Sequence, residues 1–417
     1  MNELALFGGA KSKTTDYGTG KRFGDAELQQ LREALEQNTL FYWYGAKVKA
    51  FTARFAEMYQ VRHCVATTSG TASIHVALGA LGVGPGDEVI TSPITDMGTV
   101  IGILYQNAIP IFADLDPHTY NMDPASIEEK ISYKTKAILV VHLAGNPADM
   151  DPIMAIARRH GIKVVEDCAQ SYLCSYNGRL AGTIGDIGCF SLNDFKHISA
   201  GDGGMVITND EELYKKAFRF ADKNYDRLDT TPGSGRNIPY LAPNYRMSEL
   251  QGAVGLAQLD RLGWICEKRR EYGEGLSAGI GGLPGLYPHK VLPGSQSSYW
   301  FYMLRIDEKE AGVSREQFSE ALNAEGVPNS PGYIPACVYE YDLFRNKNAF
   351  NGTHVPFDSP YYGKEVDYHT GLCPVAEEIL RTAIRLNVNE FYSERDLAET
   401  VAGIRKVSAY FAGNKSR

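Results

Sequence analysis

Residues 191–204 carry the strongest clue to the architecture of this 417-residue chain. They read Ser191-Leu192-Asn193-Asp194-Phe195-Lys196-His197-Ile198-Ser199-Ala200-Gly201-Asp202-Gly203-Gly204, a strand-like run that ends in a lysine and a glycine-rich turn. A lysine held there, rather than on a solvated helix face, can be desolvated enough for its amine to attack an aldehyde cofactor. Lys196 is therefore the first candidate catalytic residue.

Two upstream stretches supply complementary groups. Residues 163–170, which read Lys163-Val164-Val165-Glu166-Asp167-Cys168-Ala169-Gln170, indicate a buried strand that delivers a carboxylate at its carboxyl end. Residues 67–73, which read Thr67-Thr68-Ser69-Gly70-Thr71-Ala72-Ser73, join a strand to an apolar helix. Unpaired backbone N–H groups and the positive end of the helix dipole would hold a phosphate at that helix start. Phosphate cradle, carboxylate and lysine are the three anchors that pyridoxal 5'-phosphate needs.

Each anchor taken alone has an ordinary structural explanation. Most lysines are solvated charges, Asp167 could cap a helix, and Ser-Gly-Thr between a strand and a helix is often only a turn. The order of the three anchors favours the cofactor interpretation, because open α/β sheets bind ligands beyond the carboxyl ends of their strands. Ser69, Asp167 and Ser191 would all emerge at that edge.

The predicted fold class is α/β. Short apolar runs alternate with helical stretches of crossover length, which predicts a large domain with a central, mostly parallel seven-stranded sheet flanked by helices. The expected strands are 64–67, 88–91, 109–115, 137–142, 163–168, 189–192 and 204–208. The expected helices are 71–81, 97–106, 124–131, 152–160, 211–219 and 247–262.

From about residue 265 the pattern predicts a smaller C-terminal α+β domain. A strand is expected over 298–306, with helices over 315–325 and 394–407, and Ser393 is expected to cap the second helix. We therefore divide the chain into an N-terminal segment at 1–35, a large pyridoxal-phosphate-binding domain at 36–264 and a small domain at 265–417.

Six motifs follow one another over most of the chain between residues 35 and 260. They are Ser69-Gly70-Thr71-Ala72, Gly86-Asp87-Glu88-Val89-Ile90, Asp114-Leu115-Asp116, Val165-Glu166-Asp167-Cys168-Ala169-Gln170, the 191–204 stretch, and Asn244-Tyr245-Arg246-Met247-Ser248-Glu249-Leu250-Gln251. In kind and order they resemble the DegT/StrS family of sugar and cyclitol aminotransferases, within fold type I of the pyridoxal-phosphate enzymes, the aspartate aminotransferase superfamily.

The resemblance implies a role for each matching residue. Lys196 would be the Schiff-base lysine and acid/base catalyst, and Asp167 the partner of the pyridine nitrogen. Further cofactor contacts would come from Gly70, Thr71 and Ser191 at the phosphate, from Gln170 at the phenolic oxygen or ring, and from Asn244 at the phosphate of the neighbouring subunit. The active site would then be complete only in a homodimer.

The reaction implied by the resemblance is a two-stage transamination. Glutamate or glutamine would give its amino group to the cofactor, with pyridoxamine 5'-phosphate as the intermediate form, and the group would pass to a nucleotide-linked ketosugar or a free ketocyclitol. Such products serve amino-sugar, aminocyclitol or antibiotic biosynthesis. The opening residues Leu4-Ala5-Leu6-Phe7-Gly8-Gly9 look more like the cyclitol and antibiotic-pathway members.

Two alternatives stay open beside transamination, and a third is disfavoured. Some relatives dehydrate, epimerise or oxidise sugars, but the best-known dehydratase branch replaces the lysine with histidine, whereas this chain keeps Lys196. A non-catalytic sugar-sensing protein on the same fold would be expected to lose Lys196 or Asp167. A nucleotide oxidoreductase is disfavoured because Gly82-Val83-Gly84-Pro85-Gly86 lacks the G-x-G-x-x-G spacing and follows a helix.

The substrate pocket is less well marked in the sequence. Where many relatives place an aromatic residue over the cofactor ring, this chain reads Ile94-Thr95-Asp96-Met97-Gly98. Asp96 would either cap the helix at 97–106, which we favour, or meet a cationic or hydroxyl-rich substrate. Tyr44 and Tyr333, from two aromatic clusters, could stack on a sugar or cyclitol, although such clusters are more often core or interface.

Composition narrows the partners and the compartment. The net charge of -8 and the absence of a basic stripe argue against nucleic acid or an anionic membrane as the main partner. The first residues lack the pattern of a secretory signal, and no run is long enough to span a membrane. Seven scattered cysteines without a Cys-x-x-Cys pair favour a reduced cytoplasmic protein with no metal site.

Overall fold

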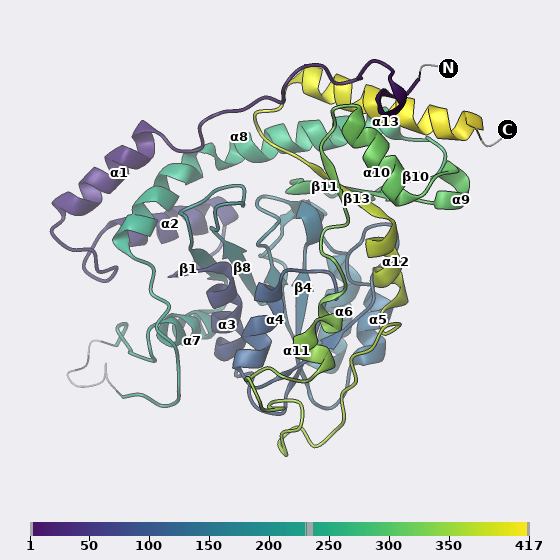
Figure 1. Ribbon diagram of the computed structural model, residues 1–417. Coiled ribbons are helices and arrows are strands. Elements are labelled where there is room, and N and C mark those ends of the chain that lie inside the picture. Colours follow the sequence, from purple (N-terminus) through teal and green to yellow (C-terminus); the bar gives the residue numbers. More distant parts are fainter. Residues whose placement is uncertain (1–2, 230, 232–236, 415–417) are drawn as a thin grey trace.

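A central sheet of seven strands organises the computed structural model, which describes residues 3–229, 231 and 237–414 (Figure 1). The strand order is β1-β9-β8-β5-β4-β2-β3. The strands are β1 (His63–Thr67), β2 (Glu88–Thr91), β3 (Ile109–Phe112), β4 (Thr135–Val141), β5 (Lys163–Asp167), β8 (Ile187–Ser191) and β9 (Gly204–Thr208). Only β9 runs antiparallel to its neighbours, so the other six strands end at the same edge. The predicted α/β class and mostly parallel sheet are confirmed.

Helices cover both faces of this sheet. They include α2 (Lys47–Tyr59), α3 (Gly70–Ala80), α4 (Met97–Tyr105), α5 (Pro124–Lys130), α6 (Met150–His160) and α7 (Glu211–Ala221). Every residue of α3 except Thr71 is buried, because the helix packs against strands on one side and against α4 and α7 on the other. A helix that is apolar on all sides is expected in such a position. Its first residues therefore have little freedom to move.

The helix expected at 247–262 is much longer in the structure. It is α8 (Glu249–Ile280), and it runs along the top of Figure 1 from α1 (Asp25–Glu36) toward α13 (Glu394–Asn414). Ser248 and Gln251 form a capping box at its start. Gly263 costs about 1 kcal/mol in a helix interior, and buried side chains such as Ile265, Tyr272 and Leu276 offset that cost. The expected domain boundary at 264/265 lies inside α8, and the division stays a prediction.

The C-terminal region holds a second, antiparallel sheet of four strands. Their order is β10 (Leu286–Pro288), β11 (Phe301–Ile306), β13 (Ala383–Asn387), β12 (Asn329–Pro331). Its helices are α9 (Glu308–Ala311), α10 (Arg315–Ala324), α11 (Asp342–Arg345), α12 (Pro374–Thr382) and α13. The small domain thus has the predicted α+β class. The Ser393 hydroxyl accepts a hydrogen bond from the Asp396 N–H at 3.2 Å, as the predicted cap requires.

Alternation along β11 shows how the two sheets meet. Tyr302, Leu304 and Ile306 pack into a core formed with α8, α10 and α13, whereas Phe301 and Met303 belong to the core beneath the large sheet. Residues of β11 and its neighbour β13 that face the second way therefore point toward the large domain. A short hairpin of β6 (Ser175–Tyr176) and β7 (Arg179–Leu180) lies between β5 and β8 in sequence.

The two ends of the described chain lie close together beside α13 (Figure 1). Lys13 Nζ and Asp396 Oδ1 form a buried ion pair there, 2.6 Å apart. Within residues 3–229, 231 and 237–414, none of the helices combines the length and apolarity needed to cross a bilayer. All seven cysteines are free thiols.

Candidate active site

A cavity of about 230 Å³ opens where the parallel strands end. It is formed by the turns that follow β1, β2, β5 and β8, as expected for an open α/β sheet. Most of the predicted cofactor residues line it, together with Asp96; the full lining is Ser69, Gly70, Thr71, Ile74, Thr95, Asp96, Gly98, Thr99, Asp167, Ala169, Gln170, Ser191, Asn193, Lys196 and Asp202. Residues more than 120 positions apart in sequence thus meet in one space.

The start of α3 forms one wall of the cavity. The Ser69 hydroxyl accepts a hydrogen bond from the Ala72 N–H at 3.0 Å and caps the helix. A Cβ atom on Gly70 would lie 2.5 Å from Ser191 Cβ, so a side chain at position 70 would displace Ser191. Glycine is required for this close approach, and the positive helix end beside a serine hydroxyl suits a phosphate.

Asp167 lies at the end of β5 and is only 5% exposed. Its carboxylate accepts hydrogen bonds from the Ala169 N–H at 3.0 Å and from the Thr99 hydroxyl at 2.8 Å. Burial raises the pKa of Asp167, while these two bonds and the charge of Lys196 oppose the rise. A buried carboxylate of this kind suits a cationic ligand group such as a protonated pyridine.

Lys196 is 9% exposed and lies in the turn after β8. Burial lowers its pKa to about 8, although the carboxylates of Asp167 and Asp96 favour the charged form. The ammonium lies over the ring of Trp300, 3.8 Å from the centroid. The backbone of the turn is held by Arg22, whose guanidinium donates to the carbonyl oxygens of Asp194 and Lys196. An amine with this pKa is available as a nucleophile near neutral pH.

Gln170 and Tyr333 meet on the small-domain side of the cavity. Gln170 Nε2 donates to the Tyr333 hydroxyl at 3.2 Å, and Gln170 Oε1 accepts from the Ala144 N–H at 2.7 Å. Burial raises the pKa of the Tyr333 hydroxyl, so the group stays neutral at physiological pH. Gln170 is thereby fixed from both ends.

Asp96 caps α4, because its carboxylate accepts from the Gly98 N–H at 2.8 Å. The predicted capping role is confirmed. The residue is nevertheless exposed and lines the cavity, and it lies close enough to influence the pKa values of Lys196, Tyr333 and Tyr341. Capping uses one side of the carboxylate and leaves a charge at the cavity wall.

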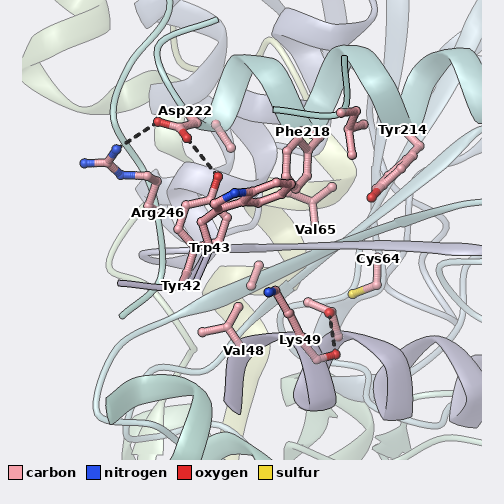
Figure 2. Close-up of a pocket in the computed structure, with 14 residues that line it drawn as sticks. Tyr42, Trp43, Val48, Lys49, Cys64, Val65, Tyr214, Phe218, Asp222 and Arg246 are labelled. Atoms are coloured by element: carbon pink, nitrogen blue, oxygen red, sulfur yellow. Dashed lines mark hydrogen bonds and ion pairs between the residues drawn. The ribbon is translucent and has the colours of Figure 1, made fainter. Parts of the chain in front are cut away.

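Three predicted residues do not line this cavity: Tyr333, which reaches it only through Gln170, and Asn244 and Tyr44. Asn244 is exposed and pairs in a β-bridge with Asp222, and Tyr44 is 74% exposed. A separate pocket has a volume of about 180 Å³. Figure 2 shows its lining, in which Asp222 accepts hydrogen bonds from the Tyr42 hydroxyl and from Arg246; the two bonds measure 2.8 Å and 3.0 Å. None of the predicted cofactor residues lines that pocket.

Three residues at the site were not singled out from the sequence: Thr99, Trp300 and Arg385. Thr99 is the donor to Asp167, and Trp300 contacts Lys196. The Arg385 guanidinium carbon lies 5.2 Å from the Phe301 ring centroid, on the face of β13 that points toward the large domain. Among the residues described in the structure, Arg385 forms no ion pair, and its Nε atom is buried without a partner. Only the alternation of β13 could have indicated this orientation.

Behind Asp167 lies a buried group of His142, Glu166 and Cys168, whose ligand atoms fall within 4.8 Å of one another. The Ala148 N–H donates to His142 Nδ1 at 3.0 Å, so Nε2 carries the proton and donates to Glu166 at 2.9 Å. Burial raises the pKa of Glu166, but the His142 bond and backbone N–H groups hold it below its ordinary value. These hydrogen bonds indicate that the group is structural and supports the end of β5.

The donor set fits pyridoxal 5'-phosphate. The α3 start with Gly70, Thr71 and Ser191 offers N–H and hydroxyl donors to a phosphate, and Gly70 leaves the room that a Cβ would fill. Asp167 offers a buried carboxylate to a ring nitrogen, and Lys196 offers an amine to an aldehyde. One cavity therefore contains all three anchors.

Comparisons with known proteins agree with this geometry. Residues 21–356 match the model of the DegT/DnrJ/EryC1/StrS aminotransferase family. The chain is 33% identical over 390 residues to the spore coat polysaccharide biosynthesis protein SpsC of Bacillus subtilis strain 168, covering 92% of this chain and 95% of that one. It is 38% identical over 340 residues to the L-glutamine:2-deoxy-scyllo-inosose aminotransferase of Micromonospora echinospora, covering 78% and 80%.

A solved structure shows the same architecture. The aminotransferase from Psychrobacter cryohalolentis superposes with a TM-score of 0.84 at 30% identity, covering 95% of this chain and all of that one. Family match, sequence identity and fold agree over most of the length. The chain is therefore an aminotransferase and belongs to the DegT/DnrJ/EryC1/StrS family.

Proposed function

We propose that this enzyme transfers an amino group from glutamate or glutamine to the ketone of a nucleotide-linked sugar or a cyclitol, with pyridoxal 5'-phosphate as cofactor. The observation that carries the proposal is the meeting of Lys196, Asp167 and the start of α3 in one cavity. When bound, the cofactor supplies an aldehyde that condenses with amines and a protonated ring that accepts electrons. Lysine at position 196 argues against the sugar dehydratase alternative.

The residues of the cavity divide the work of holding the cofactor. Gly70, Thr71 and Ser191 bind the phosphate, and the carboxylate of Asp167 keeps the ring nitrogen protonated. Gln170 contacts the phenolic oxygen or the ring, and its hydrogen bonds to Ala144 and Tyr333 keep it in place. Lys196 Nζ would be the amine that meets the aldehyde of the cofactor.

Lys196 also moves the proton. With the amino donor at the cofactor, Nζ of Lys196 would be a free amine within the same cavity. A pKa of about 8 lets it accept the α-proton of the donor and return a proton to the acceptor at near-neutral pH. The two halves of the reaction use the same atom in opposite directions.

Arg385 is the residue best suited to bind the carboxylate of the amino donor. Its guanidinium faces the large domain next to Phe301, whose ring lies 4.8 Å from that of Tyr333, and Tyr333 contacts Gln170 in the cavity. A planar guanidinium with unused donors matches a carboxylate in two-point geometry. No carboxylate of the described chain occupies this position.

The acceptor meets the polar wall of the cavity. The Asp96 carboxylate accepts hydrogen bonds from hydroxyls or binds a cationic substituent, and Tyr333 offers a ring face and a hydroxyl. Tyr44, which is exposed in one chain, contacts substrate from the neighbouring subunit. A hydroxyl-rich ring such as a sugar or cyclitol uses all three kinds of contact.

The working form is a homodimer with shared active sites. Asn244 and Tyr44 lie outside the Lys196 cavity of their own chain. Large apolar side chains near them in the sequence are exposed, among them Leu40, Ile238 and Leu241, and the Leu241 side chain is 93% exposed. Burying such side chains favours association. Asn244 binds the phosphate in the cavity of the partner.

Seven free thiols favour a reducing compartment, the cytoplasm.

Product analysis tests the reaction. The purified enzyme, loaded with pyridoxal phosphate, is mixed with glutamine or glutamate and a panel of nucleotide-linked ketosugars and free ketocyclitols, and mass spectrometry detects aminated products. The proposal expects at least one aminated product. Dehydrated or epimerised products without amination would refute it.

Hybrid dimers test the shared site. Lys196→Ala and Asn244→Ala variants are each expected to be nearly inactive, and the mixed dimer should contain one intact site formed by two chains. Activity should therefore return on subunit mixing toward a quarter to a half of the wild-type value, on the order set by the fraction of intact sites. No recovery would place Asn244 in its own subunit's site, and an Asn244→Ala variant with full activity would place the residue outside catalysis.

A further inference from the structure

The ammonium of Lys196 lies over the indole of Trp300. Lys196 Nζ lies 3.8 Å from the centroid of the ring. Among the described residues, Nζ takes part in no hydrogen bond and no ion pair within 4 Å. The most important amine of the site is therefore held by an aromatic face rather than by a carboxylate.

The same indole also holds the turn that carries the lysine. Trp300 Nε1–H donates to the carbonyl oxygen of Phe195 at 2.7 Å, one residue before Lys196. The Trp300 side chain thus contacts the Lys196 ammonium with its ring and the backbone just before Lys196 with its N–H. A residue that only filled space would need neither contact.

The backbone around Trp300 is built to place this ring. Its N–H donates to Ala144 O at 2.9 Å, and its carbonyl accepts from Arg269 at 3.2 Å. Tyr299 and Ala144 both have positive φ, at 42° and 60°. Such conformations cost about 1 kcal/mol or more for residues other than glycine and concentrate at functional sites. Two strained residues that directly support Trp300 indicate that its position matters.

Free lysine needs such a support at one stage of the reaction. While the amine is bonded to the cofactor, its position is fixed by a covalent bond. Once a donor replaces it, the flexible four-carbon stem could move the amine away from the atom that gives up its proton. An aromatic face attracts the ammonium and not the neutral amine. The indole therefore retains Lys196 once the lysine has accepted the proton of the donor and become charged.

We propose that Trp300 is a positioning residue that docks the ammonium of Lys196 whenever the lysine is not bonded to the cofactor. The ring keeps the protonated amine at the cavity wall between the two proton transfers, and the indole N–H fixes the turn. The proposal rests on the proposed role of Lys196 as the cofactor-bonding amine. It predicts that removal of the ring lowers the pKa of Lys196, because an attraction specific to the charged form is lost.

Other charged groups face the same amine and must be kept constant in a test. Asp167 and Asp96 favour the charged form, and Asp202 lines the same cavity. Arg22 reaches the turn through the Lys196 carbonyl. None of these groups is close to Trp300 in the sequence, and replacing the indole removes none of them.

Competitive labelling of cofactor-free protein measures the pKa directly. Wild type, Trp300→Leu and Trp300→Phe are exposed to a trace of acetic anhydride between pH 6 and 11, and mass spectrometry quantifies acetylated Lys196. The matched control is Trp264→Leu, which removes a 40% exposed indole that packs on Phe391. Thermal melting confirms that each variant is folded. No cofactor or substrate is present, so the result does not depend on whether the proposed reaction is right.

The expected results separate ring and N–H. Wild type and Trp264→Leu should show an inflection near pH 8. Trp300→Leu should lower it by about half to one pH unit, the equivalent of a partly buried cation–π contact. Trp300→Phe keeps a ring and should restore most of this difference. An unchanged or raised inflection in Trp300→Leu, or the same inflection in the leucine and phenylalanine variants, would overturn the proposal.

Discussion

Replacing Thr99 with valine tests whether a chain of hydroxyls beneath the cavity stabilises the Asp167 carboxylate. The Thr99 hydroxyl lies 2.8 Å from Asp167 Oδ2 and 2.6 Å from the Thr95 hydroxyl. Because an ionised carboxylate only accepts, Thr99 donates to Asp167, and Thr95 must donate to Thr99. Valine keeps the shape of threonine and removes both bonds.

The expected loss follows from the charge on the acceptor. A hydrogen bond to a charged group contributes about 1.5–3 kcal/mol to stability. Unfolding entropy of about 2.1 cal/mol/K per residue converts 1 kcal/mol into about 1 °C for a chain of 417 residues. The Tm of cofactor-free Thr99→Val should therefore fall by about 2–3 °C, and kcat/KM should fall about 10- to 150-fold if the bond also orients Asp167.

Scanning calorimetry and steady-state kinetics check the Thr99 prediction, with Thr99→Ser as the matched control that keeps the hydroxyl. The Thr99 bond lowers the pKa of Asp167, so the stability difference between variants should shrink as acid protonates the carboxyl. A valine variant as stable and active as the serine variant would refute the reasoning.

Further predictions concern the phosphate site at Gly70, the pKa of Lys196 and the binding of the amino donor. Gly70→Ala would place a Cβ 2.5 Å from Ser191 Cβ, and such overpacking costs about 1–3 kcal/mol. Absorbance titrations should then show pyridoxal phosphate binding weakened about 5- to 150-fold, whereas an unchanged affinity would show that Gly70 does not contact the phosphate. Burial lowers the pKa of Lys196 to about 8, so the fraction of neutral amine grows as the pH rises through 8. Stopped-flow absorbance should therefore show that Lys196 bonds to the cofactor faster at pH 9 than at pH 7, and a rate that does not change with pH would contradict this. Arg385→Gln should raise the KM for glutamine about 10- to 150-fold and leave the KM for the ketone within twofold. Arg385→Lys should recover little of the lost glutamine binding, because lysine lacks the two-point geometry of arginine. An unchanged KM for glutamine would show that its carboxylate binds elsewhere.

The large sheet could be predicted from sequence because its signals are local. Each strand is a short apolar run bounded by turn residues, and the strands expected over 88–91 and 204–208 have the observed bounds. Helix ends with side-chain caps, such as those set by Asp96 and Ser393, were equally clear. The length of α8 was not predicted, because the few apolar side chains of its second half, such as Tyr272 and Leu276, are buried in a core formed with the small domain.

The site divides in the same way. Lys196, Asp167 and Gly70 follow directly from strand ends and a helix start, and the structure brings them into one cavity. Trp300 and Arg385 come from the small domain, and no motif near them indicates that one face of its sheet packs against the large domain. The role of Arg385 depends on which face of β13 points inward, and that of Trp300 on the irregular backbone at Tyr299 just before β11; tertiary packing decides both.

Absorption spectra test the central claim most directly. Wild type and Lys196→Ala are each incubated with pyridoxal phosphate, and spectra are recorded before and after addition of glutamate or glutamine. The wild type should show a visible band from cofactor bonded to Lys196, the donor should bleach it as pyridoxamine phosphate forms, and Lys196→Ala should not turn over. A wild-type protein that binds the cofactor but whose spectrum no amino donor changes, or one that shows no such band, would contradict the account.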